Sequence, residues 1–189
     1  MNQLYPVFLK MDRLPLLLVG GGRVALEKLT FLLKSSPNAQ VRLVAKAFIP
    51  EVLQLIEQHC FDYCQKAYEC SDLDGVHLVV GATDDPIVNA QIYEDARHRA
   101  LLVNIADNPP LCDFYMGGIV TKGHLKIAIS TNGKSPTMAK RLRQFFEATL
   151  PDSFDELLLH LNTYRKSLRQ DFEQKVETLN QLTKSFIEK

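Results

Sequence analysis

A glycine-rich turn near the N-terminus has the spacing of a dinucleotide-binding loop. It reads Gly20-Gly21-Gly22-Arg23-Val24-Ala25, with Gly20, Gly22 and Ala25 at the defining positions of the GxGxxG/A pattern. A short apolar run precedes the turn and a stretch of helical periodicity follows it, so backbone amides at a helix N-terminus can face a pyrophosphate. We therefore expect this turn to bind a dinucleotide. The alternative is a glycine turn with a purely structural role.

A basic residue stands where this kind of loop is usually followed by an acid. In dinucleotide-binding folds an Asp or Glu about twenty residues after the glycines hydrogen-bonds the adenosine ribose. Here the second predicted strand ends in Val44-Ala45-Lys46-Ala47. We expect Lys46 or the neighbouring backbone to contact the ribose instead. Because a lysine can also bind a 2′-phosphate, the choice between NAD and NADP stays open at this site.

Two more segments with polar residues end predicted strands. They are Gly81-Ala82-Thr83-Asp84-Asp85 and Asn104-Ile105-Ala106-Asp107, and ligands of open α/β sheets bind at the carboxyl ends of the strands. We assign Thr83 to the dinucleotide site. Asp107 precedes a stiff Asn-Pro-Pro sequence and is placed to act as a general base near the nicotinamide. The alternative is that Asp107 only caps a turn.

A further polar segment combines hydroxyls, backbone amides and a cation just before a predicted helix. Such groups suit a carboxylate, so we expect this loop to bind the substrate. The alternative is an ordinary helix start, with Ser135 as the N-cap and Pro136 at the first helical position. The predicted substrate-binding residues are Ser130, Thr131, Asn132, Gly133, Lys134 and Ser135.

The distribution of charge is more informative than the net charge, which is zero. A neutral chain argues against a general nucleic-acid binder, since that function needs a basic surface. Residues 114–146, in contrast, contain no Asp or Glu and form a local cationic field. The six cations of this segment are Lys122, Lys126, Lys134, Lys140, Arg141 and Arg143.

The sequence shows no membrane segment and no metal-binding motif. The chain lacks a basic and then apolar leader at Met1, and its apolar runs are far too short to span a bilayer, so we expect a cytoplasmic protein. The four cysteines form no CxxC pair and have no histidine at metal-ligand spacing. We expect ordinary thiols and no bound metal.

The order of the predicted elements indicates an α/β fold. Short apolar runs alternate with stretches of helical periodicity, which is typical of a doubly wound Rossmann sheet of parallel strands covered on both faces. Strands are predicted at 15–20, 41–45, 61–65, 76–82 and 101–106, and helices at 23–35, 50–59 and 86–99.

The pattern changes after residue 110. Residues 114–120 and 124–130 predict a β-hairpin with Thr121-Lys122-Gly123 at its turn, and His124 reads as a packed strand residue. A helix opens at Ser135-Pro136, and a helical stripe from Phe154 to Phe186 predicts two helices or one bent helix. The expected domains are a Rossmann domain at 1–112, a small β-hairpin dimerisation unit with its helix at 113–150 and a C-terminal helical unit at 151–189.

The hairpin and the narrow apolar stripe are too small to bury their apolar residues alone. A homodimer that covers them across a two-fold axis is the expected assembly. The alternative is that the C-terminal helices fold back onto their own Rossmann sheet.

Taken in order, several motifs resemble the precorrin-2 dehydrogenase family, the dehydrogenase and ferrochelatase module of siroheme synthase. The resemblance extends from about Tyr5 to Leu150, and the C-terminal helices match only in length and character. The motifs are Pro6-Val7-Phe8-Leu9, Val19 to Ala25 with Lys28, Phe48-Ile49-Pro50, Ala82 to Asp85 with Asn89, Asn104 to Asp107, and Ser130 to Pro136 with Ala139 and Arg141.

The resemblance implies a homodimeric enzyme that uses NAD to convert precorrin-2 into sirohydrochlorin. It implies that Asp107 is the catalytic aspartate and that Arg23, Val24, Lys46 and Ala47 contact the dinucleotide. Thr131 matches a serine that is phosphorylated in the bifunctional bacterial enzyme. The chemistry agrees, because the oxidation needs a hydride acceptor and a base, and the polycarboxylate substrate suits the acid-free segment.

Two other functions stay open. Some relatives also insert iron or cobalt into sirohydrochlorin, with the same aspartate accepting the pyrrole protons; a dehydrogenase alone would pass its product to a separate chelatase. From a different class, a non-enzymatic NAD(H) sensor would report the redox state of the cofactor through its C-terminal helices. Turnover of precorrin-2 with formation of NADH separates an enzyme from a sensor.

Overall fold

The computed structural model describes residues 4–169 and 171–184. The chain divides into two compact units, and each is described by itself. The first contains Met1–Gly117 and Ser130–Ser135, and the second contains Gly118–Ile129 and Pro136–Lys189.

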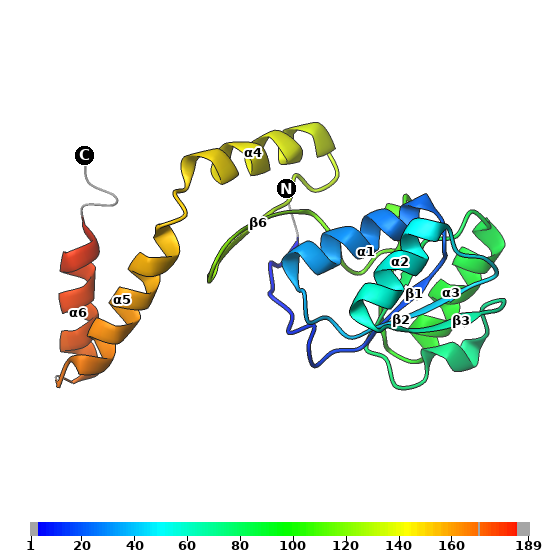
Figure 1. The fold of residues 1–189 in the computed structure, drawn as a ribbon, viewed down its shortest axis with the longest axis horizontal. Helices are drawn as coiled ribbons and strands as arrows, with labels where there is room; N and C mark the ends of the chain where they lie inside the picture. Colours follow the sequence, from blue (N-terminus) through cyan, green and yellow to red (C-terminus); the bar gives the residue numbers. More distant parts are fainter. Residues whose placement is uncertain (1–3, 170, 185–189) are drawn as a thin grey trace. The chain divides into compact units, whose positions relative to one another are not determined.

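The first unit is built on a sheet of five parallel strands (Figure 1). The strand order is β3-β2-β1-β4-β5, so the order reverses between β1 and β4. This confirms the predicted doubly wound Rossmann sheet. The strands are β1 (Leu16–Val19), β2 (Val41–Ala45), β3 (Asp62–Gln65), β4 (Leu78–Gly81) and β5 (Leu102–Ile105).

Helices cover both faces of this sheet. Helices α1 (Arg23–Ser35) and α2 (Pro50–His59) pack on one face, together with Leu16 and Leu18 of β1. Helix α3 (Pro86–His98) packs on the other face with Leu17 and Val19. Burial of both faces explains why the strands read as continuous apolar runs, and each fully buried leucine contributes about 1.5–3 kcal/mol.

Two short 3-10 turns complete the first unit, at Cys70–Leu73 and Pro109–Leu111. The predicted strand over 114–120 is wrong in its first half. Phe114 packs against the core beneath α1 and α2 instead of entering a strand, and its carbonyl oxygen accepts a hydrogen bond of 2.7 Å from Asn104 Nδ2. Phe114 is apolar and lies next to a buried face of the sheet, so it packs into that core and not into the hairpin.

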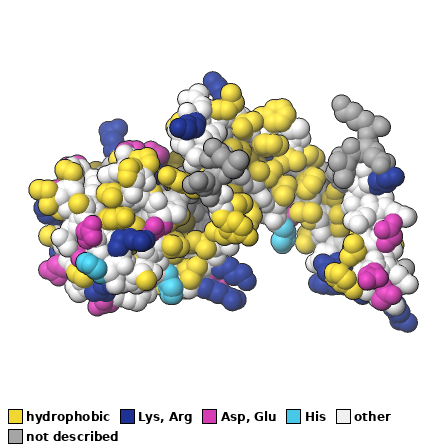
Figure 2. Space-filling model, turned by 180° about the vertical axis from the view of Figure 1, so that it is seen from behind, with side chains coloured by type: hydrophobic (Ala, Val, Ile, Leu, Met, Phe, Trp, Pro, Cys, Tyr) yellow, Lys and Arg dark blue, Asp and Glu magenta, His cyan; other side chains and the backbone are white. Residues whose placement is uncertain are grey.

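The second unit contains a hairpin and three helices. Strands β6 (Gly118–Lys122) and β7 (Leu125–Ile129) pair in antiparallel fashion, as predicted. The helices are α4 (Pro136–Thr149), α5 (Phe154–Ser167) and α6 (Phe172–Thr183). The C-terminal stripe therefore forms two helices, and Phe186 lies outside the described residues. Hydrophobic side chains gather on the exposed surface of this unit (Figure 2).

The hairpin turn differs from the predicted one. Lys122 pairs with Leu125, which leaves Gly123 and His124 as a two-residue loop. Gly123 adopts a positive φ of 54°, as expected for glycine at the first central position of a hairpin turn. A Cβ at Gly123 would overlap the Asp155 carboxylate, which would have to move to accommodate a side chain.

The predicted packing of His124 inside a strand is also wrong. Its side chain is 68% exposed at the turn, and Nδ1 lies 2.8 Å from Asp155 Oδ1. The same carboxylate oxygen accepts a 2.6 Å hydrogen bond from the His124 backbone N–H. Apolar alternation along the chain could not show that the loop falls on this residue. Among the described residues, no helix is long and apolar enough to cross a membrane.

Candidate functional site

The strand register brings the predicted site residues of the first unit to one edge of the sheet. Val19 lies opposite Val44 on one side and Gly81 on the other, and Gly81 lies opposite Ile105. The segments that follow these four residues therefore share the carboxyl edge. Adjacent strands are about 4.8 Å apart, so the glycine turn after β1 is two strand spacings, roughly 10 Å, from the segment after β5. The reversal of strand order between β1 and β4 is where open α/β sheets bind ligands.

Two of the three glycines in the turn are required by close packing. Gly20 has φ of 130°, and a Cβ there would overlap the carbonyl oxygen of Ala82. A Cβ at Gly21 would overlap the carbonyl oxygen of Ala47 and lie 2.8 Å from the Phe48 ring. The turn is therefore pressed against the segments after β4 and β2. This packing fixes its backbone before any ligand binds.

Gly22 is different, because a Cβ at this position would meet no atom within 4 Å in the described chain. The residue is the N-cap of α1, in an extended conformation, and no side chain caps the helix there. The first turn of α1 contains no acid. Helix α3 starts differently, since the Asp85 carboxylate accepts hydrogen bonds from the backbone N–H groups of Ile87 and Val88, at 2.9 and 3.3 Å. Of these two helices, only α1 has a first turn whose backbone amides are not capped by a side chain.

This arrangement fits a nicotinamide dinucleotide. The uncapped amides of the first turn of α1 suit a pyrophosphate, and the open space at Gly22 allows close approach of the backbone. The predicted contact residues Arg23 and Val24 are both exposed on this first turn. Ala25, the last residue of the motif, is fully buried against the sheet, as close helix packing requires.

Lys46 and Ala47 lie directly after β2, at the same edge. The Lys46 side chain is exposed, and its backbone carbonyl accepts a 3.3 Å hydrogen bond from Gln65 Nε2. The carbonyl of Ala47 is the group that faces Gly21. Lys46 is thus free to reach an adenosine ribose or its 2′-phosphate, while Ala47 shapes the turn.

Thr83, which follows β4, is part of a small hydrogen-bond network. Its hydroxyl donates to Asn89 Oδ1 at 2.8 Å and accepts from the backbone N–H of Asp85 at 3.2 Å. Asn89 Nδ2 in turn donates to the Thr83 carbonyl at 3.0 Å. The network holds the loop between β4 and α3, so the hydroxyl of Thr83 is used internally.

Asp107 follows β5 and occupies a strained backbone conformation. Its φ is 59°, in the left-handed region that few non-glycine residues adopt. The residue is exposed, and within the described chain its carboxylate makes no hydrogen bond, so its side chain caps no turn there. Backbone strain of this kind costs about 1–3 kcal/mol and clusters at functional sites.

Sequence reasoning assigned no role to two residues packed around the Asp107 turn. The Cys112 sulfur lies 3.2 Å from the Ile105 carbonyl oxygen and 3.3 Å from that of Asn108. Asn104, only 5% exposed, directs Nδ2 toward the same sulfur at 3.4 Å. Its Oδ1 is buried without a hydrogen-bond partner among the described residues, a deficit of about 1–3 kcal/mol. The sequence signal was a polar residue inside an apolar strand.

The predicted substrate loop, Ser130–Ser135, leads directly into α4 at Pro136. The Thr131 hydroxyl accepts a hydrogen bond from the Ser135 backbone N–H at 3.2 Å and donates to its carbonyl at 3.1 Å. Asn132 and Gly133 both have positive φ, 52° and 73°. The Thr131 hydroxyl is thus occupied in shaping the loop, whereas Asn132, Gly133 and Lys134 are exposed.

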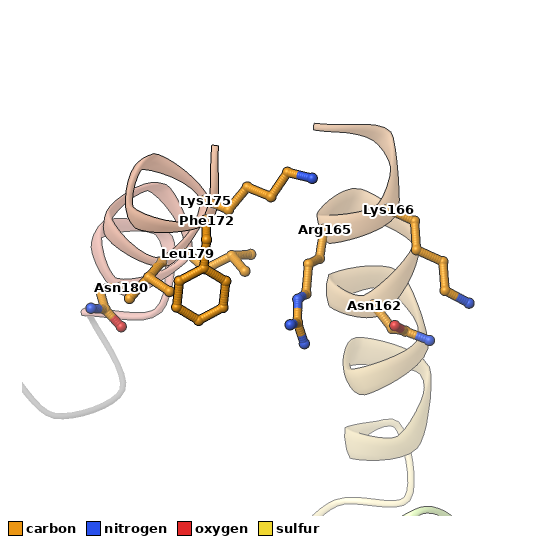
Figure 3. A pocket seen from close by; sticks show the side chains of 8 residues that line it. Asn162, Arg165, Lys166, Phe172, Lys175, Leu179 and Asn180 are labelled. Atoms are coloured by element: carbon orange, nitrogen blue, oxygen red, sulfur yellow. The ribbon is translucent and has the colours of Figure 1, made fainter. Parts of the chain in front are cut away.

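The second unit has a groove of about 660 Å³ between α5 and α6 (Figure 3). It combines cations and amides with apolar side chains, and Arg165 and Phe172 point into the gap from opposite helices. The groove shares no residue with the predicted sites, because the sequence predicted no site residue on these helices. Its lining residues are Asn162, Arg165, Lys166, Phe172, Lys175, Val176, Leu179 and Asn180.

Within residues 4–169 and 171–184, no three His, Cys, Asp or Glu side chains are grouped so that they could hold a metal ion.

Comparison with known families identifies the domain. Residues 7–118 match the model of a family described as putative NAD(P)-binding. The chain belongs to this family. Residues 122–149 match a second model, described as the central part of sirohaem biosynthesis proteins. The family assignment confirms a nicotinamide cofactor without deciding between NAD and NADP, and the two models in sequence confirm the resemblance to the siroheme synthase module.

Individual relatives agree with this assignment. The chain is 36% identical over 172 residues to a siroheme synthase of Ruthia magnifica, which covers 91% of the chain and 36% of that protein. It is 34% identical over 165 residues to siroheme synthase 1 of Serratia proteamaculans, which covers 87% and 34%. The chain thus spans about a third of these relatives. The solved structure of SirC, a precorrin-2 dehydrogenase, shares the fold, with a TM-score of 0.77, 24% identity and coverage of 95% of this chain and 89% of that one.

Proposed function

We propose that this chain oxidises precorrin-2 to sirohydrochlorin, with NAD as the electron acceptor. The observation that carries the proposal is the register of the sheet, which puts the glycine turn and Asp107 at one edge, roughly two strand spacings apart. A bound dinucleotide and a carboxylate base can therefore serve one substrate. The names of the siroheme synthases and of SirC support the choice of substrate.

Each group of the chain has a separate task in this reaction. The first turn of α1 binds the pyrophosphate, and Lys46 and Ala47 border the adenosine half. When bound, the nicotinamide dinucleotide supplies the two-electron acceptor. Asp107 accepts the proton that the substrate releases, at a carboxylate oxygen that no other described group occupies. Asp107 is exposed just after β5, in a left-handed backbone conformation.

The substrate is a polyacid, and its recognition follows from charge. Each acetate and propionate arm of precorrin-2 ends in a carboxylate. The loop Ser130–Ser135 provides exposed groups at Asn132, Gly133 and Lys134. Residues 114–146 contain six cations and no acid, and two of these cations, Lys122 and Arg143, pair with acids outside the segment. Such a field attracts the substrate and orients it. We propose these loop residues as substrate contacts and a homodimer as the working assembly.

The choice of NAD over NADP is part of the proposal. Lys46 is the only residue of the segment after β2 whose charge could favour a 2′-phosphate. Side-by-side titrations with NADH and NADPH, followed by nicotinamide fluorescence, decide the preference. If NADPH bound more tightly than NADH, NADP would replace NAD as the proposed electron acceptor, and the proposed reaction and its residues would stay the same.

The decisive variant is Asp107→Asn, which keeps the shape of the side chain and removes the base. General-base catalysis contributes about 10²–10⁴-fold, so we expect kcat for precorrin-2 to fall by that factor while the Kd for NADH changes less than twofold. The measurement is anaerobic turnover, followed by sirohydrochlorin absorbance and NADH. Asp62→Asn is the matched control, since Asp62 is an exposed aspartate on β3.

The same assay separates the alternatives. Undiminished turnover by Asp107→Asn would remove the aspartate from the mechanism. Binding of NADH without any turnover by the unaltered protein would favour the sensor. Incubation of the protein with purified sirohydrochlorin and ferrous or cobaltous ion tests whether metal insertion is a second activity of this chain or belongs to a separate chelatase.

A further inference from the structure

We propose that Cys112 is a positioning residue that holds the Asp107 turn in its catalytic geometry. The inference rests on the proposed function, because it assigns Cys112 a task only if Asp107 is the base. It concerns a thiol whose hydrogen-bond partners are Asn104, Ile105 and Asn108. Two sets of contacts around the end of β5, and the free-energy cost that they maintain, support this role.

The first set joins the sulfur to both sides of Asp107. Cys112 Sγ lies 3.2 Å from the carbonyl oxygen of Ile105 and 3.3 Å from that of Asn108. These carbonyls bracket the two residues at the tip of the turn. A thiol has a single proton, which it can donate to either oxygen. The backbone N–H of Asn108 already donates to the Ile105 carbonyl at 3.2 Å, and the sulfur adds a second contact at the base of the turn that carries the carboxylate.

The second set fixes the sulfur. Asn104 Nδ2 lies 3.4 Å from Cys112 Sγ and donates a 2.7 Å hydrogen bond to the Phe114 carbonyl. The backbone N–H of the next residue, Asp113, donates to the Val103 carbonyl at 2.8 Å. The Asp113 carboxylate accepts from the Val103 backbone N–H at 3.1 Å. The segment around Cys112 is thus hydrogen-bonded to β5 on both sides and cannot drift from the turn.

The arrangement around the sulfur has a cost in free energy. Asn104 Oδ1 is buried without a partner among the described residues, and Asp107 is held at a positive φ. An apolar residue at position 104 would remove the buried deficit but would also release the sulfur and Phe114. An unfavourable local conformation persists only where surrounding contacts stabilise it. Here the contacts of the sulfur and of the Asn104 amide stabilise the Asp107 turn.

The chemical state of the sulfur agrees with a donor role. Burial raises the pKa of the Cys112 thiol above its ordinary value, so the group keeps its proton at neutral pH. A thiolate would face two carbonyl oxygens and repel both. The other three cysteines are exposed, which sets Cys112 apart.

The test compares Cys112→Ala and Cys112→Val, which remove the donor, with Cys112→Ser, which retains one. Misplacement of a reacting group by about 1 Å can cost 10²-fold in rate. We expect the Ala and Val variants to lower kcat at least tenfold, with KM for NAD and precorrin-2 within twofold of the unaltered protein, and Ser to recover most of the rate. Cys64→Ala, at an exposed cysteine on β3, is the matched control and should retain full activity.

A double-mutant cycle distinguishes positioning from general damage to the fold. If Cys112 acts through Asp107, adding Cys112→Ala to Asp107→Asn lowers the residual kcat less than twofold. A further tenfold loss in the double variant would overturn the proposal, as would full activity of both Cys112→Ala and Cys112→Val. Should one of these fail to fold, the other decides. Unimpaired turnover by Asp107→Asn would instead defeat the proposed function itself, so the two failures are distinguishable.

Discussion

At the scale of single residues, three consecutive glycines are present for different reasons. Gly20 and Gly21 are required by the fold, because a side chain at either position would overlap the backbone of a neighbouring segment. Gly22 has open surroundings within the described protein, so packing does not require a glycine there, and in the proposed function the pyrophosphate does. A motif that looks uniform in sequence therefore contains two positions required by folding and one proposed to be required by binding.

This difference leads to a prediction for Gly22→Ala. The added methyl group meets nothing in the described chain, so we expect the free energy of unfolding to change by less than about 0.5 kcal/mol. The same methyl group lies where the pyrophosphate must approach, so we expect the Kd for NADH to rise at least tenfold. Urea denaturation and fluorescence titration measure the two effects.

Gly20→Ala is the contrasting variant. Its Cβ would overlap the Ala82 carbonyl at a positive φ, so this variant should lose about 1–3 kcal/mol of stability. If Gly22→Ala bound NADH as tightly as the unaltered protein, the pyrophosphate would not lie at this turn.

At the scale of elements, the turn between β6 and β7 is tied to the start of α5. Asp155 accepts hydrogen bonds from the His124 backbone and ring, and Lys122 Nζ lies 2.6 Å from Asp152 Oδ1. The His124 backbone hydrogen bond, with the ring as second cause, lowers the pKa of Asp155 below its ordinary 3.8. The Lys122 ammonium likewise lowers the pKa of Asp152. Both carboxylates are therefore stabilised as anions by the hairpin turn.

These shifts predict an acid-sensitive contact. A carboxyl whose pKa is lower in the folded state stabilises that state above its unfolded pKa, and the contribution is lost as pH falls through the folded value. We expect the hydrogen-exchange protection factor of the His124 amide to be constant from pH 7 to 5 and to fall below about pH 4.

Asp155→Ala should make that amide weakly protected at every pH, whereas Glu156→Ala, an exposed acid in the same helical turn, should preserve the pH profile. Constant protection through pH 3 in the unaltered protein would contradict the assignment.

At the scale of the whole molecule, α4 carries an exposed apolar face. Met138, Leu142 and Phe145 are 54%, 37% and 59% exposed, and their spacing of four and three residues puts them on one side of the helix. Contiguous exposed apolar side chains mark interaction surfaces. This face is the best candidate for the surface that a homodimer would bury.

We therefore predict that Phe145→Glu weakens the dimer. A charge at the centre of a buried apolar face costs several kcal/mol when it has no partner, so the variant should sediment as a monomer at micromolar concentration. Gln144→Glu introduces the same charge about 100° around α4 from Phe145, outside the apolar face, and should leave the dimer intact. Sedimentation velocity measures both, and a monomeric unaltered protein would rule out the predicted assembly.

The sequence by itself determined the elements and predicted where along the chain the cofactor binds. Continuous apolar runs, helical periodicity and the glycine turn are local signals, because strand and helix burial and turn geometry depend on residues close together in the chain. The parallel sheet, its helices and the existence of the hairpin followed from them. The same local signals assigned Asp107 to the end of β5, at the edge of the sheet.

Only the tertiary structure decided which side chains meet at that edge and how. Alternation along the chain could not show that the hairpin loop falls on His124, or that Phe114 packs into the core. Nor could it show that the Cys112 sulfur bridges the two sides of the Asp107 turn, with Asn104 fixing it. These contacts depend on the path by which the chain returns to β5, and that path is set by burial and hydrogen bonding of the segment as a whole, not by the type of any one residue.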